Sequence, residues 1–290
     1  MSQFVILTDS SADLPLELVE KLDVQVLPLS CTMDGETFFN YPDNRDMDPH
    51  AFYDLLRAGK MASTSAVNVA QYTDIIEPFV KQGQDVLVLA FSSGLSTTYN
   101  SAVIAADDLR EKYPQRKIFV VDTLCASLGQ GMLVYLAAKE REKGKSIEEV
   151  RDWAEENKLS VSHQFTVDDL HFLKRGGRVS ATTAVVGSML AIKPVLHVDN
   201  EGHLINIGKV RGRAASLKAL VDAMGKAVID PADQTIFISH GDCWDDANAV
   251  ADMVKERFGV KEVIINYVGP VIGAHAGPGV VALFYIAKER

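Results

Sequence analysis

The first 160 residues alternate short apolar runs with segments of helical periodicity. The apolar runs stand at 4–10, 24–32, 85–91 and 117–123. Among the helical segments, Pro15 suits a first turn, Gly83 follows a last turn, and Ser146 with Glu149 has the spacing of a capping box. Strands that alternate with helices predict a parallel, doubly wound sheet, an α/β domain of the Rossmann-like class. Its ligands are expected at the carboxyl ends of the strands.

The second half has a different order of elements. Residues 193–211 contain two strand-like runs joined by an Asn200–Glu201–Gly202 turn, which predicts an antiparallel hairpin. Helical patterns follow at 213–229 and 245–259, and strand-like runs at 234–241, 262–269 and 280–287. This order predicts an α+β domain with a mostly antiparallel sheet. We therefore expect two domains, residues 1–160 and residues 161–290.

Charge and cysteine content narrow the class of protein. A net charge of −10 disfavours broad contact with nucleic acid or an anionic membrane, because a polyanion is repelled by the summed field. Cys31, Cys125 and Cys243 are far apart and have no zinc-type spacing, which fits a reducing cytoplasm. There is no basic leader at the N-terminus, and no apolar run approaches about 18 residues. We expect a cytoplasmic protein that neither binds nucleic acid nor inserts stably into a membrane.

Hydroxyl side chains cluster where the apolar run 85–91 meets the next helical segment. This cluster contains Ser92, Ser93, Ser96, Thr97 and Thr98. A helix N-terminus presents unpaired N–H groups and partial positive charge, so hydroxyls there can form an anion pocket. Simple helix capping explains the same residues, and both interpretations stay open. The patterns of a phosphate-binding P-loop and of a nucleophile elbow are both absent.

Other polar residues follow the remaining predicted strands. Ser63, Thr64 and Ser65 precede a helical segment, where capping alone would account for them. A further set should share the carboxyl edge of the parallel sheet: Asp9, Ser10, Ser11, Asp122, Thr123 and Ser127. The Asp-x-Asp spacing typical of phosphohydrolase metal sites is missing after the first strand, so we expect no metal.

Three segments of the C-terminal half carry candidate chemistry. His275 stands in a glycine-rich stretch that we expect to be a loop, where it could donate to an anion or shuttle a proton. Arg175 and Arg178 lie in a basic segment that suits either a helix end or a docking site for an acidic partner. The apolar stretch 184–198 is core by default. With Met132, Leu133 and Leu136 it could instead line a tunnel for a chain of methylenes.

Six motifs, in order over the whole chain, resemble the DegV family of bacterial fatty-acid-binding proteins. They are TDSSADLP at 8–15, STS at 63–65, SSGLSTTYNSA at 92–102, DTLCASLGQG at 122–131, LKRGGRVS at 173–180 and GPVIGAHAGPG at 269–279. The resemblance implies a two-domain carrier that holds one long-chain fatty acid, such as palmitate or oleate, between its domains and uses no cofactor. It also implies a partner, a separate ATP-dependent fatty acid kinase to which the carrier presents the carboxylate for acyl-phosphate formation.

The resemblance also assigns roles to individual residues. Thr64, beside Ser65, and Ser96, with Ser93 close by, match the hydroxyls that bind the carboxylate. His275 matches the histidine of the family's glycine-rich segment. Arg211 resembles the arginine near the head group, while Arg178 and Arg175 resemble the surface that meets the kinase. The chain departs from the family pattern at Ala66, Val67 and Thr97, where Gln, Pro and Gly are usual.

Two other classes of function remain open from the sequence. One is a hydrolase or phosphotransferase that uses Ser93 or Ser96 with His275. That reading requires the histidine within hydrogen-bond reach of the serine and a third group to orient it. The other is a small-molecule sensor, which would change its partner or DNA binding on taking up a ligand.

Overall fold

Short apolar runs of the N-terminal half form a parallel four-stranded sheet, as predicted. The computed structural model describes residues 4–179 and 191–290. Side chains alternate along these strands, so that Ile6 and Leu87 face one core cluster and Val5 and Val86 face another. The sheet has the order β2-β1-β6-β7, with β1 (Phe4–Asp9), β2 (Val24–Leu27), β6 (Asp85–Ala90) and β7 (Ile118–Asp122).

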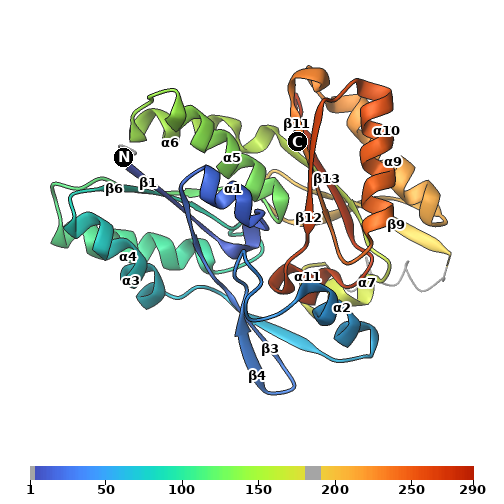
Figure 1. Ribbon diagram of the computed structural model, residues 1–290, viewed down its shortest axis with the longest axis horizontal. Coiled ribbons are helices and arrows are strands. Elements are labelled where there is room, and N and C mark those ends of the chain that lie inside the picture. Colours follow the sequence, from blue (N-terminus) through green and yellow to red (C-terminus); the bar gives the residue numbers. More distant parts are fainter. Residues whose placement is uncertain (1–3, 180–190) are drawn as a thin grey trace.

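Helices cover both faces of this sheet, which is the doubly wound arrangement (Figure 1). One face is covered by α3 (Val69–Lys81) and α4 (Thr98–Lys112), and the other by α5 (Leu128–Glu142) and α6 (Ile147–Asn157). The capping box of Ser146 and Glu149 is present at the start of α6, as predicted. Smaller helical elements of the chain are η1 (Ser10–Ala12), α1 (Leu16–Lys21), α2 (Pro49–Arg57), η2 (Lys158–Ser160), α7 (Leu170–Arg175) and η3 (Pro231–Asp233).

The C-terminal half forms a six-stranded, mostly antiparallel sheet, which confirms the predicted fold class. Among the described strands of this sheet, β11 and β12 are the one parallel pair. The predicted hairpin is the pair β9 (Ile192–Val198) and β10 (Leu204–Arg211), with an irregularity between Asn206 and Gly208. The order is β10-β9-β8-β13-β11-β12, with β8 (Val161–Thr166), β11 (Thr235–His240), β12 (Glu262–Tyr267) and β13 (Val281–Ile286). Helices α9 (Arg213–Ala227) and α10 (Trp244–Phe258) share a core cluster with it.

A third, small sheet departs from the sequence-based expectation. The apolar run 24–32 is two strands, because Pro28 has no N–H for a ladder and β2 ends at Leu27. The second strand, β3 (Ser30–Met33), pairs with β4 (Glu36–Phe39) and β5 (Ala62–Ser65) in the order β4-β3-β5. Thr64 and Ser65 therefore lie on a strand, not at a helix N-terminus, and Asn68 caps α3.

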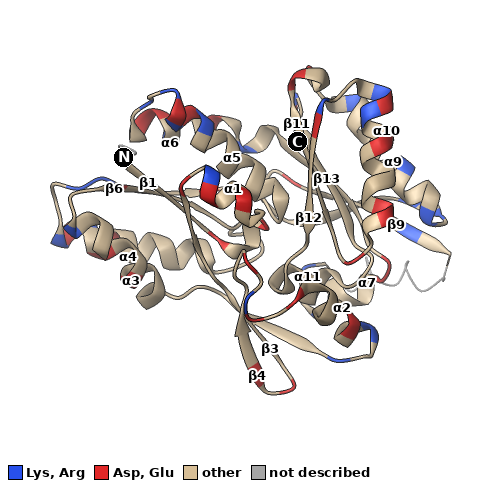
Figure 2. Cartoon of the chain, viewed as in Figure 1, with Lys and Arg blue, Asp and Glu red and all other residues tan. Residues whose placement is uncertain are grey.

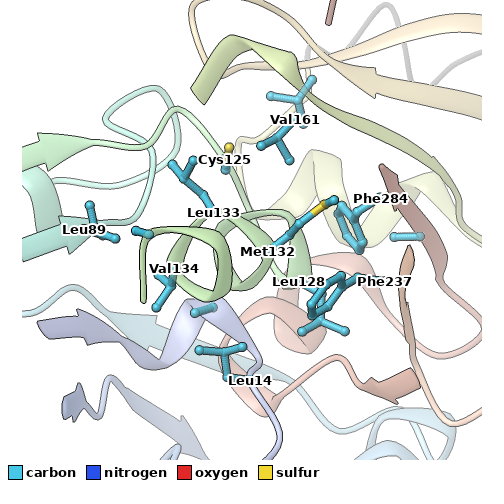
Figure 3. Packing of buried hydrophobic residues seen from close by; sticks show 14 of the residues in the cluster. Leu14, Leu89, Cys125, Leu128, Met132, Leu133, Val134, Val161, Phe237 and Phe284 are labelled. Carbon is cyan, nitrogen blue, oxygen red and sulfur yellow. The ribbon is translucent and has the colours of Figure 1, made fainter. Parts of the chain in front are cut away.

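The two large sheets meet at α5. Strands of the parallel sheet all precede residue 160, and strands of the six-stranded sheet all follow it. Figure 3 shows α5 surrounded by buried residues of both halves, among them Leu89, Phe237 and Phe284. Met132 and Leu133 belong to this core, Leu136 packs against it, and none of the three lines the pocket described below, which agrees with the core interpretation and not with the tunnel alternative. Segment 184–198 lies partly outside the described residues; within it, Val198 does line that pocket.

The glycine-rich segment near the C-terminus was expected to be a loop. It is instead a short helix, α11 (Pro270–Ala276). Pro270 occupies its first turn, and Gly277 ends it with a φ of 78°, a conformation that favours glycine. Helix α11 packs against α2, α7, β3 and β5, so it joins the C-terminal half to the small sheet. The fold thereby places His275 beside residues from the first third of the chain.

Charged side chains lie mainly on the outer helices. Figure 2 shows both signs along α6, α9 and α10, whereas α11 and the strands β8, β11 and β13 carry no Lys, Arg, Asp or Glu. Among the described residues, none of the helices combines the length and hydropathy needed to cross a bilayer.

Candidate functional site

A cavity of about 420 Å³ lies where the carboxyl ends of β6 and β7, the helix α11 and one face of the six-stranded sheet come together. Its volume falls within the range of small-molecule sites, about 300–1,000 Å³. Most of its wall is apolar. Residues that form this apolar wall include Phe91, Phe165, Val198, Ile272, Val280 and Phe284.

The pairing of the strands explains why there is free space at the inner end of the cavity. Ala282 pairs with Phe165 on one side and with Ser239 on the other, so these three side chains form one row on the sheet face. In the next row, Phe284 pairs with His163. The small side chain of Ala282 between larger neighbours leaves room above the sheet.

The exposed end of the cavity, which we call the mouth, is polar. Five of the six residues predicted to bind the carboxylate line this one pocket: Thr64, Ser65, Ser93, Ser96 and His275. Arg178, predicted as a residue of the kinase-docking surface, lines it as well. Thr64 and Ser65 come from β5, Ser93 and Ser96 from the turn between β6 and α4, and His275 from α11. Arg211, the sixth predicted carboxylate-binding residue, is exposed at the end of β10 and does not line the pocket; Arg175, the other predicted docking residue, is exposed on α7.

Thr64 and His275 are joined by a hydrogen bond. The distance between Thr64 Oγ1 and His275 Nε2 is 2.8 Å. Burial, with Arg178 and Arg175 nearby, lowers the pKa of His275 to about 4, so the imidazole is neutral at neutral pH. A neutral imidazole has one N–H; if it is on Nε2, Thr64 accepts from it and its own hydroxyl proton can point to a ligand.

Several other hydroxyls at the mouth are available to a ligand. Ser96 Oγ lies 2.9 Å from Thr98 Oγ1, and either oxygen can be the donor. In the part of the chain that the structure describes, the hydroxyls of Ser65, Ser93 and Thr97 have no hydrogen-bond partner. These hydroxyls and the Thr64–His275 pair form a set of neutral donors around one end of an apolar cavity.

Arg178 brings a positive charge to the mouth. Its guanidinium donates to the carbonyl oxygen of Leu95 at 3.0 Å and to that of Gly176, so it ties the end of α7 to the turn after β6. Half-burial lowers its pKa. Arg175, in contrast, is exposed, and its guanidinium lies over the ring of Phe172, 4.8 Å from the centroid.

The arrangement of the mouth does not suit nucleophilic catalysis. His275 bonds to Thr64, and across the described ranges neither Ser93 nor Ser96 has a histidine partner. A histidine with a pKa of about 4 is also a weak base at neutral pH. Among the described residues, the pairing of Ser93 or Ser96 with His275 that the hydrolase or phosphotransferase interpretation needs is not formed.

The strand-end carboxylates organise the loops of the site. Asp9 is fully buried and accepts from the backbone N–H groups of Ser11 and Phe91. Burial is the largest influence on its pKa and raises it. Asp122 accepts from the N–H groups of Ser93 and Leu124. The carboxylate oxygens of Asp9 and Asp122 thus fix the turns that follow the strands, including the turn that carries Ser93 and Ser96.

Two further serines line the inner part of the cavity, Ser127 and Ser239. Ser127 had been expected at the carboxyl edge of the parallel sheet, but Ser239 was not recognised from the sequence. Its position near the carboxyl end of β11, two residues before Gly241, could have indicated a binding site, because ligands often bind at such strand ends.

Comparisons with known proteins agree with this architecture. Residues 3–288 match the family described as "Uncharacterised protein, DegV family". A DegV domain-containing protein of Clostridium perfringens is 49% identical over 290 residues, covering 100% of this chain and 99% of its own length. A DegV lipid-binding protein of Thermotoga maritima has a similar structure, with a TM-score of 0.86, 30% identity and 99% of each chain covered. A fatty-acid-binding DegV family protein of Thermus thermophilus gives a TM-score of 0.86 at 29% identity, covering 98% of this chain and 99% of its own.

Proposed function

The chain belongs to the DegV family, and on this premise we propose that it is a carrier that binds one long-chain fatty acid in the pocket and performs no chemistry on it. The acyl chain lies against the apolar wall, and the carboxylate lies at the mouth. Solved structures of similar fold are described as lipid-binding and fatty-acid-binding proteins, which supports the assignment.

The walls of the pocket supply the affinity for the acyl chain. Burying each methylene contributes about 0.8 kcal/mol, so a chain of more than a dozen methylenes has a large driving force even after its ordering costs. Phe165, Val198 and Phe284 are buried and leave few polar atoms along the cavity. Such a lining favours an unbranched aliphatic chain.

Neutral hydroxyls at the mouth supply the specificity for a carboxylate. The hydroxyls of Thr64, Ser96 and Ser93, the last without a partner among the described residues, can each donate to it. Hydrogen bonds to a charged acceptor contribute about 1.5–3 kcal/mol each. Arg178 adds a favourable positive field at the mouth, where its guanidinium also donates to two carbonyl oxygens.

The observation that carries the proposal is a mostly apolar cavity that ends at hydroxyls around the Thr64–His275 pair. Native mass spectrometry of the protein purified from cells grown with palmitate or oleate tests it. We expect a mass increase of one fatty acid per chain, and rebinding of either acid after delipidation. A protein that carries no lipid and does not rebind micromolar palmitate or oleate would contradict the proposal.

We further propose that the loaded protein presents its carboxylate to a separate ATP-dependent kinase. In that reaction a carboxylate oxygen attacks the γ-phosphorus of ATP, ADP leaves, and an acyl phosphate forms. Arg175 is the exposed cation nearest in sequence to the mouth residue Arg178, in a chain with a net charge of −10. A local basic spot of this kind suits an acidic docking surface on the partner.

A further inference from the structure

The pocket contains a second polar group, which lies away from the mouth. Ser127 precedes α5 and Ser239 lies near the end of β11, and their exposed fractions are 5% and 0%. Behind them is Asp13, which accepts from the N–H of Gly269 at the start of α11. His275 is at the other end of α11, about 9 Å further at a rise of about 1.5 Å per residue. The serine pair therefore contacts a different part of any bound chain.

Above the pKa of Asp13, which burial raises to about 7, counting protons fixes the direction of the hydrogen bonds in this group. Ser127 Oγ lies 2.5 Å from Asp13 Oδ2, and an ionised carboxylate only accepts, so Ser127 donates to Asp13. A hydroxyl has a single proton, so Ser127 must then accept from Ser239, whose Oγ lies 2.9 Å away. Ser239 is therefore the first donor in this series of hydrogen bonds, and its single hydroxyl proton is used in the bond to Ser127.

The oxygen of Ser239 consequently has free acceptor capacity. Within residues 4–179 and 191–290 no other donor reaches this oxygen. It lines the cavity and is completely buried, so water cannot freely satisfy it once an acyl chain fills the space. A methylene opposite Ser239 would leave the acceptor without a partner, whereas a hydroxyl would donate to it.

Neighbouring groups leave room for this contact and do not compete for it. Ala282, the cross-strand partner of Ser239, has a small side chain. His163, the other polar group of the inner cavity, is already occupied: Nε2 accepts from the N–H of Ala126 at 3.2 Å, and Nδ1 lies 3.0 Å from the carbonyl of Val161. Ser239 Oγ is thus the acceptor available for a hydrogen bond from a hydroxyl substituent on the acyl chain.

We propose that Ser239, oriented by Ser127 and Asp13, is a subsite for a hydroxyl group within the acyl chain, and that the pocket therefore prefers a hydroxy fatty acid with its hydroxyl at the matching carbon. This inference rests on the proposed function and specifies its ligand class. The competing explanation is that the Asp13–Ser127–Ser239 chain only ties η1, α5 and β11 together.

Affinities for stearic acid, a positional series of hydroxystearic acids and the corresponding ketostearic acids test the proposal, measured at a pH at which Asp13 is ionised. We expect one hydroxy isomer to bind about tenfold tighter than stearic acid, the value of one well-made hydrogen bond. The keto acid with its oxygen at the same carbon should gain nothing, because a ketone cannot donate. A keto acid that gains equally would mean that the subsite offers only space, and would overturn the proposal.

Ser239→Ala should abolish the preference for the hydroxy isomer and leave the affinity for stearic acid unchanged. Ser239→Cys keeps the size of the side chain with a poor acceptor, and it should behave in the same way if the alanine variant fails to fold. Ser162→Ala is the matched control, because Ser162 is a buried serine of β8 that does not line the pocket. A preference that persists without Ser239, or is absent in the unaltered protein, would overturn the subsite. Loss of stearic acid binding itself would instead count against the proposed function.

Discussion

Oγ1 of Thr64 lies 2.8 Å from Nε2 of His275, although 211 residues separate the two in the chain. The contact exists because α11 packs against β5 and thereby closes the mouth of the pocket from two sides. It joins a neutral imidazole to a hydroxyl at the place where we propose that a carboxylate binds.

Removing hydroxyl donors at the mouth should weaken fatty-acid binding. For Thr64→Val with Ser96→Ala, we expect the dissociation constant for palmitate or oleate to rise about 30-fold or more, since two donors are lost and each costs at least about 1 kcal/mol. A fluorescence displacement assay measures this change. Ser63→Ala removes an exposed hydroxyl of the same strand that does not line the pocket, and it should bind as the unaltered protein does. Equal affinities in all three proteins would remove Thr64 and Ser96 from the site.

Gly176 should be needed for the position of His275. A Cβ at residue 176 would overlap Nδ1 of His275, so Gly176→Ala must push the imidazole away from its place beside Thr64. We expect weaker fatty-acid binding, as for the double variant at Thr64 and Ser96. The unfolding midpoint should change little, because the His275 side chain that moves is half-buried. Gly177→Ala is a poor control, since Gly177 has a φ of 72°. Gly208→Ala is better, because a Cβ there meets only an ordinary contact with Val195. Unchanged affinity in Gly176→Ala would show that the histidine position does not matter.

The docking proposal predicts separate effects on binding and transfer. Arg175→Ala should leave the affinity for the fatty acid unchanged and slow acyl-phosphate formation by the cognate kinase, because Arg175 is exposed and outside the pocket. Lys174→Ala, an exposed neighbour of the same charge, controls for a general loss of positive charge. Equal kinase rates for the unaltered protein and Arg175→Ala would refute the docking role.

Asp13 should make the protein less stable as pH rises from about 4 to about 7. Burial, partly offset by hydrogen bonds from Ser127 and Gly269, raises the pKa of Asp13 to about 7, from 3.8 for an unperturbed carboxyl. Between these values the folded chain binds the proton and the unfolded chain does not, so the free energy of unfolding falls as pH rises. Linkage puts this fall at about 2–3 kcal/mol between pH 5 and pH 8.

Urea unfolding of Asp13→Asn at both pH values measures that contribution. An asparagine does not titrate, so the fall in the free energy of unfolding from pH 5 to pH 8 should be smaller in the variant than in the unaltered protein. Asp9 faces Asp13 and is itself buried with a raised pKa, and Tyr53 is the other titratable group near it. Both are present in the two proteins, so their effects largely cancel. Identical pH dependence in the two proteins would contradict the assignment.

Local sequence patterns determined much of the fold. Alternation of apolar runs with helical segments determined the parallel sheet, because the period of the apolar positions is set by the backbone geometry of each element. The Ser146–Glu149 capping box and the 193–211 hairpin were visible for the same reason, since each is formed by residues close together in the chain. The hydroxyl clusters at 63–65 and 92–98 could also be recognised in the sequence, because they are runs of polar residues beside apolar segments.

Tertiary structure alone decided which of those residues meet. Sequence placed Thr64 at a helix N-terminus and His275 in a loop; pairing of β5 with β3 and packing of α11 put them on a strand and a helix in contact. Arg178 and Arg211 have the same side chain, yet one lines the pocket and the other is exposed, because burial depends on neighbours from distant segments. The acceptor at Ser239 follows only from a chain of hydrogen bonds between residues more than 100 positions apart, and no local pattern encodes such a contact.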